Sequence, residues 1–216
     1  MTTRRTGLRE QKKQATRAAL REAALRLALE HGPENVRVDD IADAAGVSPR
    51  TYNNYFSSRE QAIVAAITAE REARIAEEVA AAPAHISLAD ALTGAIVARY
   101  TEPGDTERFL ITATPPLRDA FLDAATELEG PLAEAIGRRL GSTTTLTAQV
   151  LAAAVAAAVR IALHQWLGAT AGTSAAPEGL VVPSGSLADR LRATLAPLAP
   201  ALDAAEERSR RQRQAE

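Results

Sequence analysis

The side chains best suited to chemistry in this sequence lie in one short polar segment that follows a glycine. Residues 48–56 read Ser-Pro-Arg-Thr-Tyr-Asn-Asn-Tyr-Phe. Guanidinium and amide groups can make paired hydrogen bonds to the edges of DNA bases, while hydroxyl groups can bond phosphates. The segment therefore suits contact with a nucleic-acid duplex. Its candidate contact residues are Ser48, Arg50, Thr51, Asn53, Asn54 and Tyr55.

Two short helices joined by a tight turn are needed to present such a segment. Residues 38–45 carry apolar side chains at the i, i+3, i+4, i+7 spacing of a helix with one apolar face. Gly46 then tolerates a positive φ, and Ser48-Pro49 supplies the N-cap and first residue of a helix over 49–55. This order predicts a helix-turn-helix, although a small three-helix bundle that binds no DNA could show the same order.

The N-terminal end of the chain is basic. Before Pro33 there are eight basic and three acidic residues, a net charge of +5, whereas the whole chain carries −2. We expect the arm before Lys13 to enter the minor groove of DNA. The backbone contacts expected outside the polar segment are Lys12, Lys13, Arg37 and Arg59. A basic helix face exposed to solvent is the alternative explanation.

The rest of the chain also predicts helices. Ala, Leu, Arg and Glu dominate, so we expect an all-α fold with a helix over 11–31 and a long helix that begins at Arg59. We assign residues 1–62 to a helix-turn-helix domain with a basic N-terminal arm, and 63–203 to a larger helical domain. Residues 204–216 are expected to form a charged, frayed tail.

From about Lys12 to Ile67 the chain resembles the N-terminal domain of the TetR family of bacterial regulators. The matching segments are Thr16–Leu20, Val38–Ser48 and Thr51–Glu60. The sequence departs from the family where an aromatic residue and, two positions later, a histidine are common, because Asn53 and Tyr55 stand there. Which recognition-helix residues contact bases rather than phosphates is therefore left open.

The resemblance implies a ligand-responsive transcription regulator, typically a repressor, that binds a palindromic operator in double-stranded DNA as a homodimer. In the family, the last two long helices pair with their copies, and here these are 147–167 and 186–198. Leu151, Val155, Ala158 and Ala162 lie at helical spacing in the first of them and form an apolar surface that needs a partner. The alternative is that this helix is the central core helix of the monomer.

The larger domain is expected to enclose a small apolar or amphipathic effector that releases the regulator from DNA. A looser resemblance, carried by Asn53-Asn54-Tyr55-Phe56, is to a subgroup that binds acyl-CoA-like ligands. Arg160 and His164 are possible polar anchors, but each aromatic or histidine could instead be an ordinary core residue. The candidate ligand-binding residues are Tyr100, Phe109, Leu110, Thr112, Phe121, Arg160, His164 and Trp166.

Composition argues against several other classes of protein. There is no cysteine, the three histidines (His31, His85 and His164) are scattered, and no phosphate-binding loop or metal-ligand spacing occurs. We therefore expect no catalytic residues, no cofactor and no metal, so an enzyme is the weaker alternative. A helical interaction module would not explain the polar segment. The apolar stretch 151–163 is too short to span a bilayer and contains Arg160, so we expect a cytoplasmic protein without a membrane partner.

Overall fold

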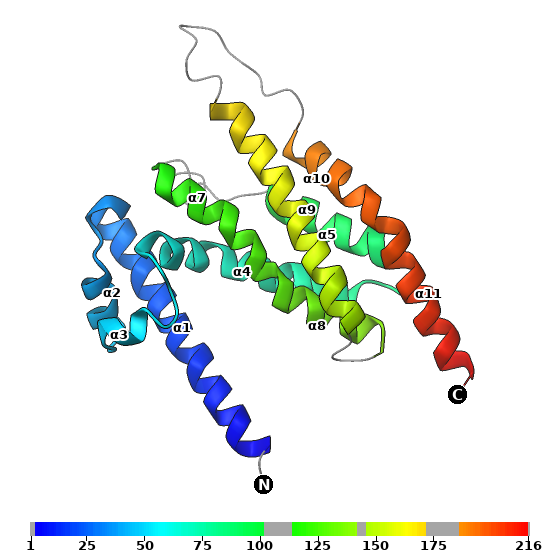
Figure 1. Cartoon of the computed structure of the whole chain (residues 1–216), viewed down its shortest axis with the longest axis horizontal. Coiled ribbons are helices and arrows are strands. Elements are labelled where there is room, and N and C mark those ends of the chain that lie inside the picture. Colours follow the sequence, from blue (N-terminus) through cyan, green and yellow to red (C-terminus); the bar gives the residue numbers. More distant parts are fainter. Residues whose placement is uncertain (1–2, 102–113, 142–145, 172–185, 216) are drawn as a thin grey trace, which may run out of the picture. The chain divides into compact units, whose positions relative to one another are not determined.

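The computed structural model describes residues 3–101, 114–141, 146–171 and 186–215, and Figure 1 shows them as a set of helices. No strand occurs within these ranges. The expected all-α fold is therefore confirmed, because a chain dominated by Ala, Leu, Arg and Glu offers good helix formers almost throughout.

The chain divides into two compact units. The first comprises residues 1–70 and 105–124, and the second comprises 71–104 and 125–216. Helix α4 (Arg59–Ala81) contributes its first half to one unit and its second half to the other.

In the first unit, α1 (Thr3–His31) packs against α2 (Val38–Ala44), and α2 packs against α3 (Pro49–Tyr52). A short 3-10 turn, η1 (Pro33–Asn35), follows Gly32 and leads from α1 into α2. The unit also contains the first half of α4 and α7 (Pro115–Ala124). Its buried side chains are small, branched or aromatic and include Leu20, Ala24, Ile41, Ala42, Tyr52, Phe56 and Ile63.

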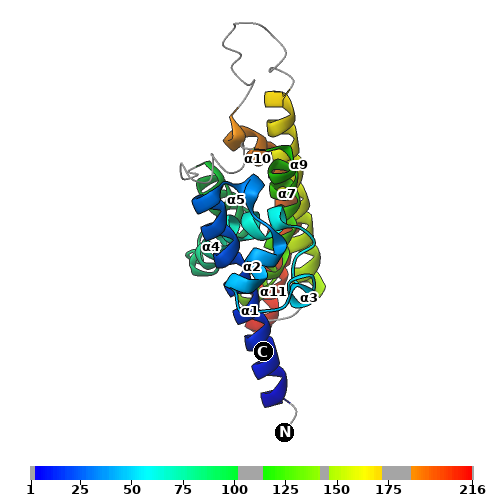
Figure 2. The same ribbon diagram turned by 90° about the vertical axis from the view of Figure 1, so that its left-hand side faces the viewer.

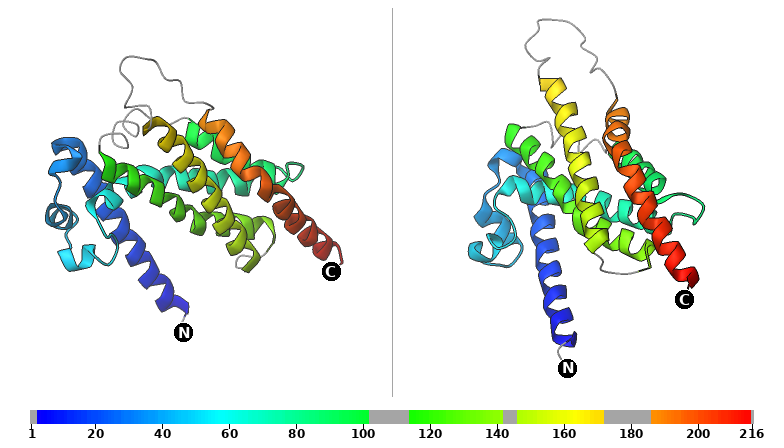
Figure 3. Two further views of the ribbon diagram at one scale, coloured as in Figure 1. Left: turned by 45° about the horizontal axis from the view of Figure 1, so that its top comes forward. Right: turned by 45° about the vertical axis from the view of Figure 1, so that its right-hand side comes forward.

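In the second unit, α9 (Leu146–Ala171) packs against α8 (Glu129–Arg139), against α10 (Leu187–Leu195) and against η2 (Ala125–Leu128). Helix α5 (Leu88–Thr101) contacts α10 and α11 (Ala199–Ala215). Figure 3 shows α9 and α10 running side by side, with α11 continuing the path of α10 after the short turn η3 (Ala196–Leu198).

The helix ends differ from the sequence-based expectations in several places. Helix α1 already begins at Thr3, and α3 ends at Tyr52 rather than at residue 55. The expected tail after residue 203 is not frayed but belongs to α11, which buries Glu206 and Ser209 against the rest of the unit.

Helix α9 is longer than the apolar stretch 151–163 suggested. Residues Leu146–Leu167 are long and apolar enough to cross a membrane by length and composition, so the expectation that the stretch is too short is wrong. One face of the helix packs inside the second unit, as core helices of globular proteins also do. Its buried residues include all four for which we expected a partner: Leu151, Val155, Ala158 and Ala162. These side chains are therefore core residues of the protomer.

Candidate nucleic-acid interface

The turn after α2 is closed by its own backbone. Gly46 has a φ of +68°, and its N–H donates to the Asp43 carbonyl at 3.0 Å. The Val47 N–H donates to the Ala42 carbonyl at 2.9 Å. This pair of bonds is a Schellman motif, which satisfies the last carbonyls of a helix when the following residue adopts a left-handed conformation. The chain therefore reverses sharply between α2 and α3.

Ser48 starts α3 as expected. Its Oγ accepts a hydrogen bond from the Thr51 N–H at 3.1 Å and shares a second with the Thr51 Oγ1 at 2.9 Å. Pro49 follows as the first helical residue, where its missing N–H costs nothing. The two hydroxyls bond each other, so Ser48 and Thr51 fix the start of the helix in addition to any contact they make with a phosphate.

A buried aromatic pair holds α3 in place. Tyr52 is completely buried, and its hydroxyl donates to the Ser58 carbonyl at 2.7 Å. The Tyr52 ring lies 5.8 Å from the Phe56 ring, centroid to centroid. The Arg17 guanidinium of α1 lies over Phe56, 5.5 Å from its centroid. Tyr52 was not predicted to be this anchor. The four-residue spacing between Tyr52 and Phe56 places both rings on one side of a helix and was the feature of the sequence that could have predicted it.

With Tyr52 turned inward, its neighbours point outward. Arg50, Asn53 and Asn54 are exposed, whereas Thr51 and Tyr55 are half-buried. Figure 2 turns the side of the first unit that carries α2 and α3 toward the viewer. The structure thus places three exposed guanidinium and amide side chains on one short helix and the turn that follows it.

Arg59 has a different position from the one expected for a DNA contact. Its Nη1 donates to the carbonyls of Glu34 at 2.8 Å and Val36 at 2.7 Å, and its Nε donates to Glu60 Oε1 at 2.7 Å. Burial by itself would raise the pKa of Glu60, but the hydrogen bond and charge of Arg59 lower it below its ordinary value. Arg59 therefore ties the start of α4 to the segment before α2.

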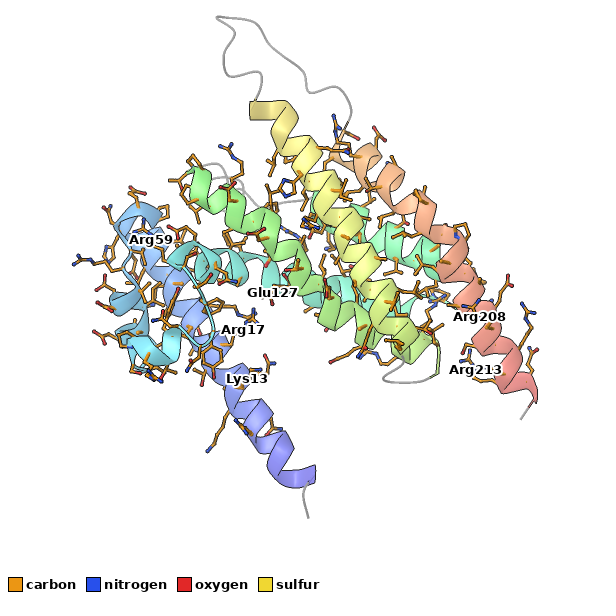
Figure 4. The ribbon with its side chains drawn as sticks, viewed as in Figure 1. Lys13, Arg17, Arg59, Glu127, Arg208 and Arg213 are labelled. Atoms are coloured by element: carbon orange, nitrogen blue, oxygen red, sulfur yellow. The ribbon has the colours of Figure 1, made fainter. Side chains whose placement is uncertain are left out.

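The remaining basic candidates are accessible. Lys12, Lys13 and Arg37 are exposed, and Figure 4 shows Lys13 and Arg17 along α1. The arm before Lys13 is helical from Thr3 onward. An α-helix is about 10–12 Å across and the minor groove of B-DNA only about 6 Å, so this segment does not fit the groove in the form seen here. The expected minor-groove arm is therefore not supported by its geometry.

The described candidate effector residues are distributed over both units. Tyr100 is buried in the second unit, where the Arg71 guanidinium lies 4.6 Å from its ring centroid. Trp166 is half-buried, while Arg160 and His164 are exposed on α9. Phe121 is buried in the first unit. Phe109, Leu110 and Thr112 lie outside the described residues. Arg160 and His164 are thus surface residues of this protomer and do not line its interior.

Arg71 is not among the residues that the sequence predicted for a site. Arg71 and its neighbour Glu72 are both buried, and burial lowers the pKa of Arg71 while Tyr100 and Glu72 oppose that change. Its position within the apolar periodicity of α4 gave the only hint that this charge is internal.

Comparisons with known proteins agree with this geometry. Residues 20–66, which include α2, the turn and α3, match the family of bacterial regulatory proteins called the tetR family. The chain is 34% identical over 147 residues to the HTH-type transcriptional regulator TcmR of Streptomyces glaucescens; the match covers 62% of this chain and 65% of that regulator's length. A solved structure assigned to the TetR-family transcriptional regulators, from a Rhodococcus species, is 21% identical. The superposition covers 88% of this chain and 99% of that structure, with a TM-score of 0.41. The similarity to the family therefore rests on the sequence matches. The segment 20–66, which contains the helix-turn-helix, is therefore similar to the TetR family of bacterial regulatory proteins, and the chain spans just under two thirds of the length of the regulator TcmR.

Proposed function

We propose that this chain is a cytoplasmic transcription regulator that reads operator DNA with α3 and the turn after it. The observation that carries the proposal is the exposure of Arg50 on α3 and of Asn53 and Asn54 in the turn that follows, next to the buried anchor Tyr52. TetR-family proteins are DNA-binding regulators rather than enzymes, and the chain is not an enzyme. Arg59 is left out of the proposed DNA contacts because its guanidinium binds the protein's own carbonyls.

Selection of binding sites from a random duplex library tests the proposal. The full chain should enrich a two-fold symmetric sequence, because a two-fold dimer places two recognition helices one helical turn apart. Arg50→Ala should then weaken binding to the selected duplex by about 10- to 100-fold, since one bidentate base contact is worth about 1–3 kcal/mol. Arg26→Ala is the matched control, because this exposed arginine pairs only weakly with Glu30 on the far half of α1. No enrichment of any sequence would refute the proposal.

We propose that dimerisation uses the outer face of α9 together with α10. Leu146, Val150 and Ile161 are large apolar residues that are 76%, 59% and 48% exposed. They recur at helical spacing and share their face with the small side chains of Ala153 and Ala157. Such a face favours close approach of a second copy, while the opposite face of α9 is filled by the protomer's own core.

Charge placed on this face should dissociate the dimer. Each substitution occurs twice across a two-fold interface, so we expect Val150→Glu with Ile161→Glu to weaken dimerisation by at least 100-fold, about 3 kcal/mol. Sedimentation velocity measures the change. Leu29→Glu places the same charge on an equally exposed apolar residue of α1 and should leave the oligomeric state unchanged. A double variant that still sediments like the unmodified chain would exclude this interface.

We further propose that the regulator is a repressor, and that a small apolar or amphipathic effector binds the second unit and releases the DNA. The support is the similarity to the TetR family, in which such effectors are typical, and the second unit contains a buried cation, Arg71, beside the ring of Tyr100. A medium-chain acyl-CoA and its free fatty acid are suitable probes. Either should lower the affinity of the unmodified chain for its selected duplex, whereas Arg71→Gln should reduce that response. Binding of a probe without any loss of DNA affinity would contradict release.

A further inference from the structure

The N-terminal part of α1 extends beyond the packed region of its own unit. Figures 1 and 3 show α1 continuing past α2 and α3 toward the N-terminus. Arg9, Lys12, Lys13, Gln14 and Ala15 are all exposed, and among the described side chains of this helix the buried ones begin at Leu20. The core of the first unit therefore does not explain why these exposed positions are helical.

The exposed basic residues keep the register of the packed face. Arg9, Lys13 and Thr16 precede Leu20 at steps of four, three and four residues, and the buried Ala23 and Ala24 continue the series. Positions three or four apart share one face of a helix. The face of α1 that packs on the helix-turn-helix therefore continues, beyond the unit, as a basic face on the same side.

Composition decides what such a face can bind. Between Arg9 and Ala19 no apolar residue is larger than alanine, and from residue 3 to residue 21 the chain has seven basic residues against Glu10 alone. A helix that lies in a membrane surface needs a large apolar face, and an apolar protein partner needs one too. A polyanion needs only the charges.

We propose that residues 3–15 form a helical rod that lies along the phosphate backbone of DNA, beside the base pairs contacted by α3, with Arg9, Lys12 and Lys13 as its phosphate contacts. This inference rests on the proposed function and adds a second, sequence-independent surface to it. At 1.5 Å per residue the rod is about 20 Å long, enough to pass roughly six base pairs. As a helix it binds the backbone from outside and leaves the minor groove empty.

Salt dependence measures the phosphate contacts directly. The probe is a mixed-sequence duplex of about 40 base pairs, which needs no known operator. Replacing Arg9, Lys12 and Lys13 by glutamine should reduce the slope of log affinity against log salt by roughly 2 to 3 per protomer, since each phosphate contact contributes about 0.9. The matched control replaces the exposed Arg138, Arg208 and Arg211 of the second unit by glutamine, which makes the same change in net charge. An equal reduction in both variants, or none in the first, would overturn the proposal.

A proline distinguishes a rod from a flexible arm. Gln14→Pro keeps every charge but breaks the helix, because the ring removes one hydrogen bond and clashes with the carbonyl four residues earlier. If residues 3–15 bind DNA as a helix, the variant should lose affinity for the 40-base-pair duplex by about tenfold or more. Unchanged affinity would indicate a flexible arm and would refute the helical form. Circular dichroism should show that the rest of the chain stays helical.

Two further measurements separate this inference from the proposed function. In one outcome, the triple-glutamine variant retains the full salt slope while Arg50→Ala still weakens binding to the selected duplex. This outcome would exclude the rod and support the proposed role of α3. In the other outcome, Arg50→Ala leaves the affinity for the selected duplex unchanged while the triple variant shows a smaller salt slope. This outcome would exclude base contacts by α3 and support the rod. Binding of the unmodified chain, but not of the triple variant, to phosphatidylserine vesicles more tightly than to the duplex would show that the rod binds membranes and would overturn the proposal.

Discussion

Gly46 is the residue on which the sharp turn between α2 and α3 depends. A Cβ at this position would meet no atom within 4 Å, so space does not require glycine there. Its φ of +68° does, because side chains other than glycine adopt left-handed backbone at a cost of about 1–2 kcal/mol. The turn angle is therefore set by backbone conformation and not by packing.

Alanine substitutions at two glycines separate these effects. Gly46→Ala should lower the free energy of unfolding by about 1 kcal/mol and weaken DNA binding, because strain at the turn disturbs α3. Gly94→Ala, in the middle of α5 and also with open space around its Cβ, should raise stability by roughly 0.5–1 kcal/mol through helix propensity. Urea unfolding followed by circular dichroism measures both. The two substitutions should change the free energy of unfolding in opposite directions. An increase in stability on Gly46→Ala would contradict the positive φ.

Tyr100 is the second residue whose environment makes a measurable prediction. Burial raises its pKa from 10.0 to about 12, although the charge of Arg71 acts in the opposite direction. The folded state therefore holds the phenol proton more tightly than the unfolded state does. By linkage, this contribution is fully present below pH 10 and is lost as the pH rises toward 12.

Unfolding in urea at pH 8 and at pH 11 tests this linkage. We expect the chain to lose stability between the two values, by an amount that for Tyr100 alone does not exceed about 3 kcal/mol. Tyr100→Phe should make the loss smaller, because it removes the phenol whose pKa the fold raises. An identical loss in the Tyr100→Phe variant would show that this phenol is not protected by the fold.

At the scale of elements, the second unit is joined by a buried ion pair between α8 and α11. Arg139 Nε lies 2.7 Å from Glu206 Oε1, and the two side chains are only 7% and 6% exposed. Arg139 also donates to the carbonyls of Ala82, at 3.0 Å, and Ile86. The other carboxylate oxygen of Glu206 accepts from the Leu88 N–H at 3.0 Å. One carboxylate thus binds a guanidinium and the first turn of α5.

Glu206→Gln should therefore destabilise the second unit by about 3 kcal/mol, because it leaves the buried Arg139 charge uncompensated. Its neighbour supplies the control. Glu207 forms an exposed pair with Arg211 at 3.3 Å, so Glu207→Gln should change stability by less than about 0.5 kcal/mol. Thermal unfolding compares the two. Equal effects would mean that the buried pair contributes no more than a surface pair.

At the scale of the whole chain, the charged C-terminal residues prove to be part of the folded unit. Asp203 Oδ1 accepts from the Ala89 N–H at 3.1 Å, and Arg210 Nη2 donates to the Ala84 carbonyl at 2.9 Å. Ser209 donates to the carbonyl of Leu140. Helix α11 therefore satisfies polar backbone groups in two connections of the second unit.

Truncation tests this role. A chain that ends at Asp203 should lose most of its cooperative unfolding, because it lacks Glu206 and Ser209, whereas a chain that ends at Arg211 keeps both and should unfold like the full chain. Scanning calorimetry shows the difference. If the chain that ends at Asp203 unfolds at the same temperature as the full chain, residues 204–216 do not contribute to the fold and behave as a tail.

The sequence by itself determined the helix-turn-helix, because every part of that motif acts over a few residues. The left-handed glycine, the Ser48 cap and the apolar spacing of α2 are local choices of backbone and side chain, and the structure reproduces each of them. The same locality explains why Arg50, Asn53 and Asn54 were found as outward-facing residues.

Only the tertiary structure decided the matters that depend on distant partners. Arg59 binds carbonyls 23 and 25 residues away, and Arg139 pairs with a glutamate 67 residues away, so neither partner could be inferred from spacing. Helix α9 carries apolar residues on its exposed face as well as on its buried face, so periodicity could not tell which of the two lies in the core. A local pattern fixes conformation, but burial is set by whichever segments the fold brings together.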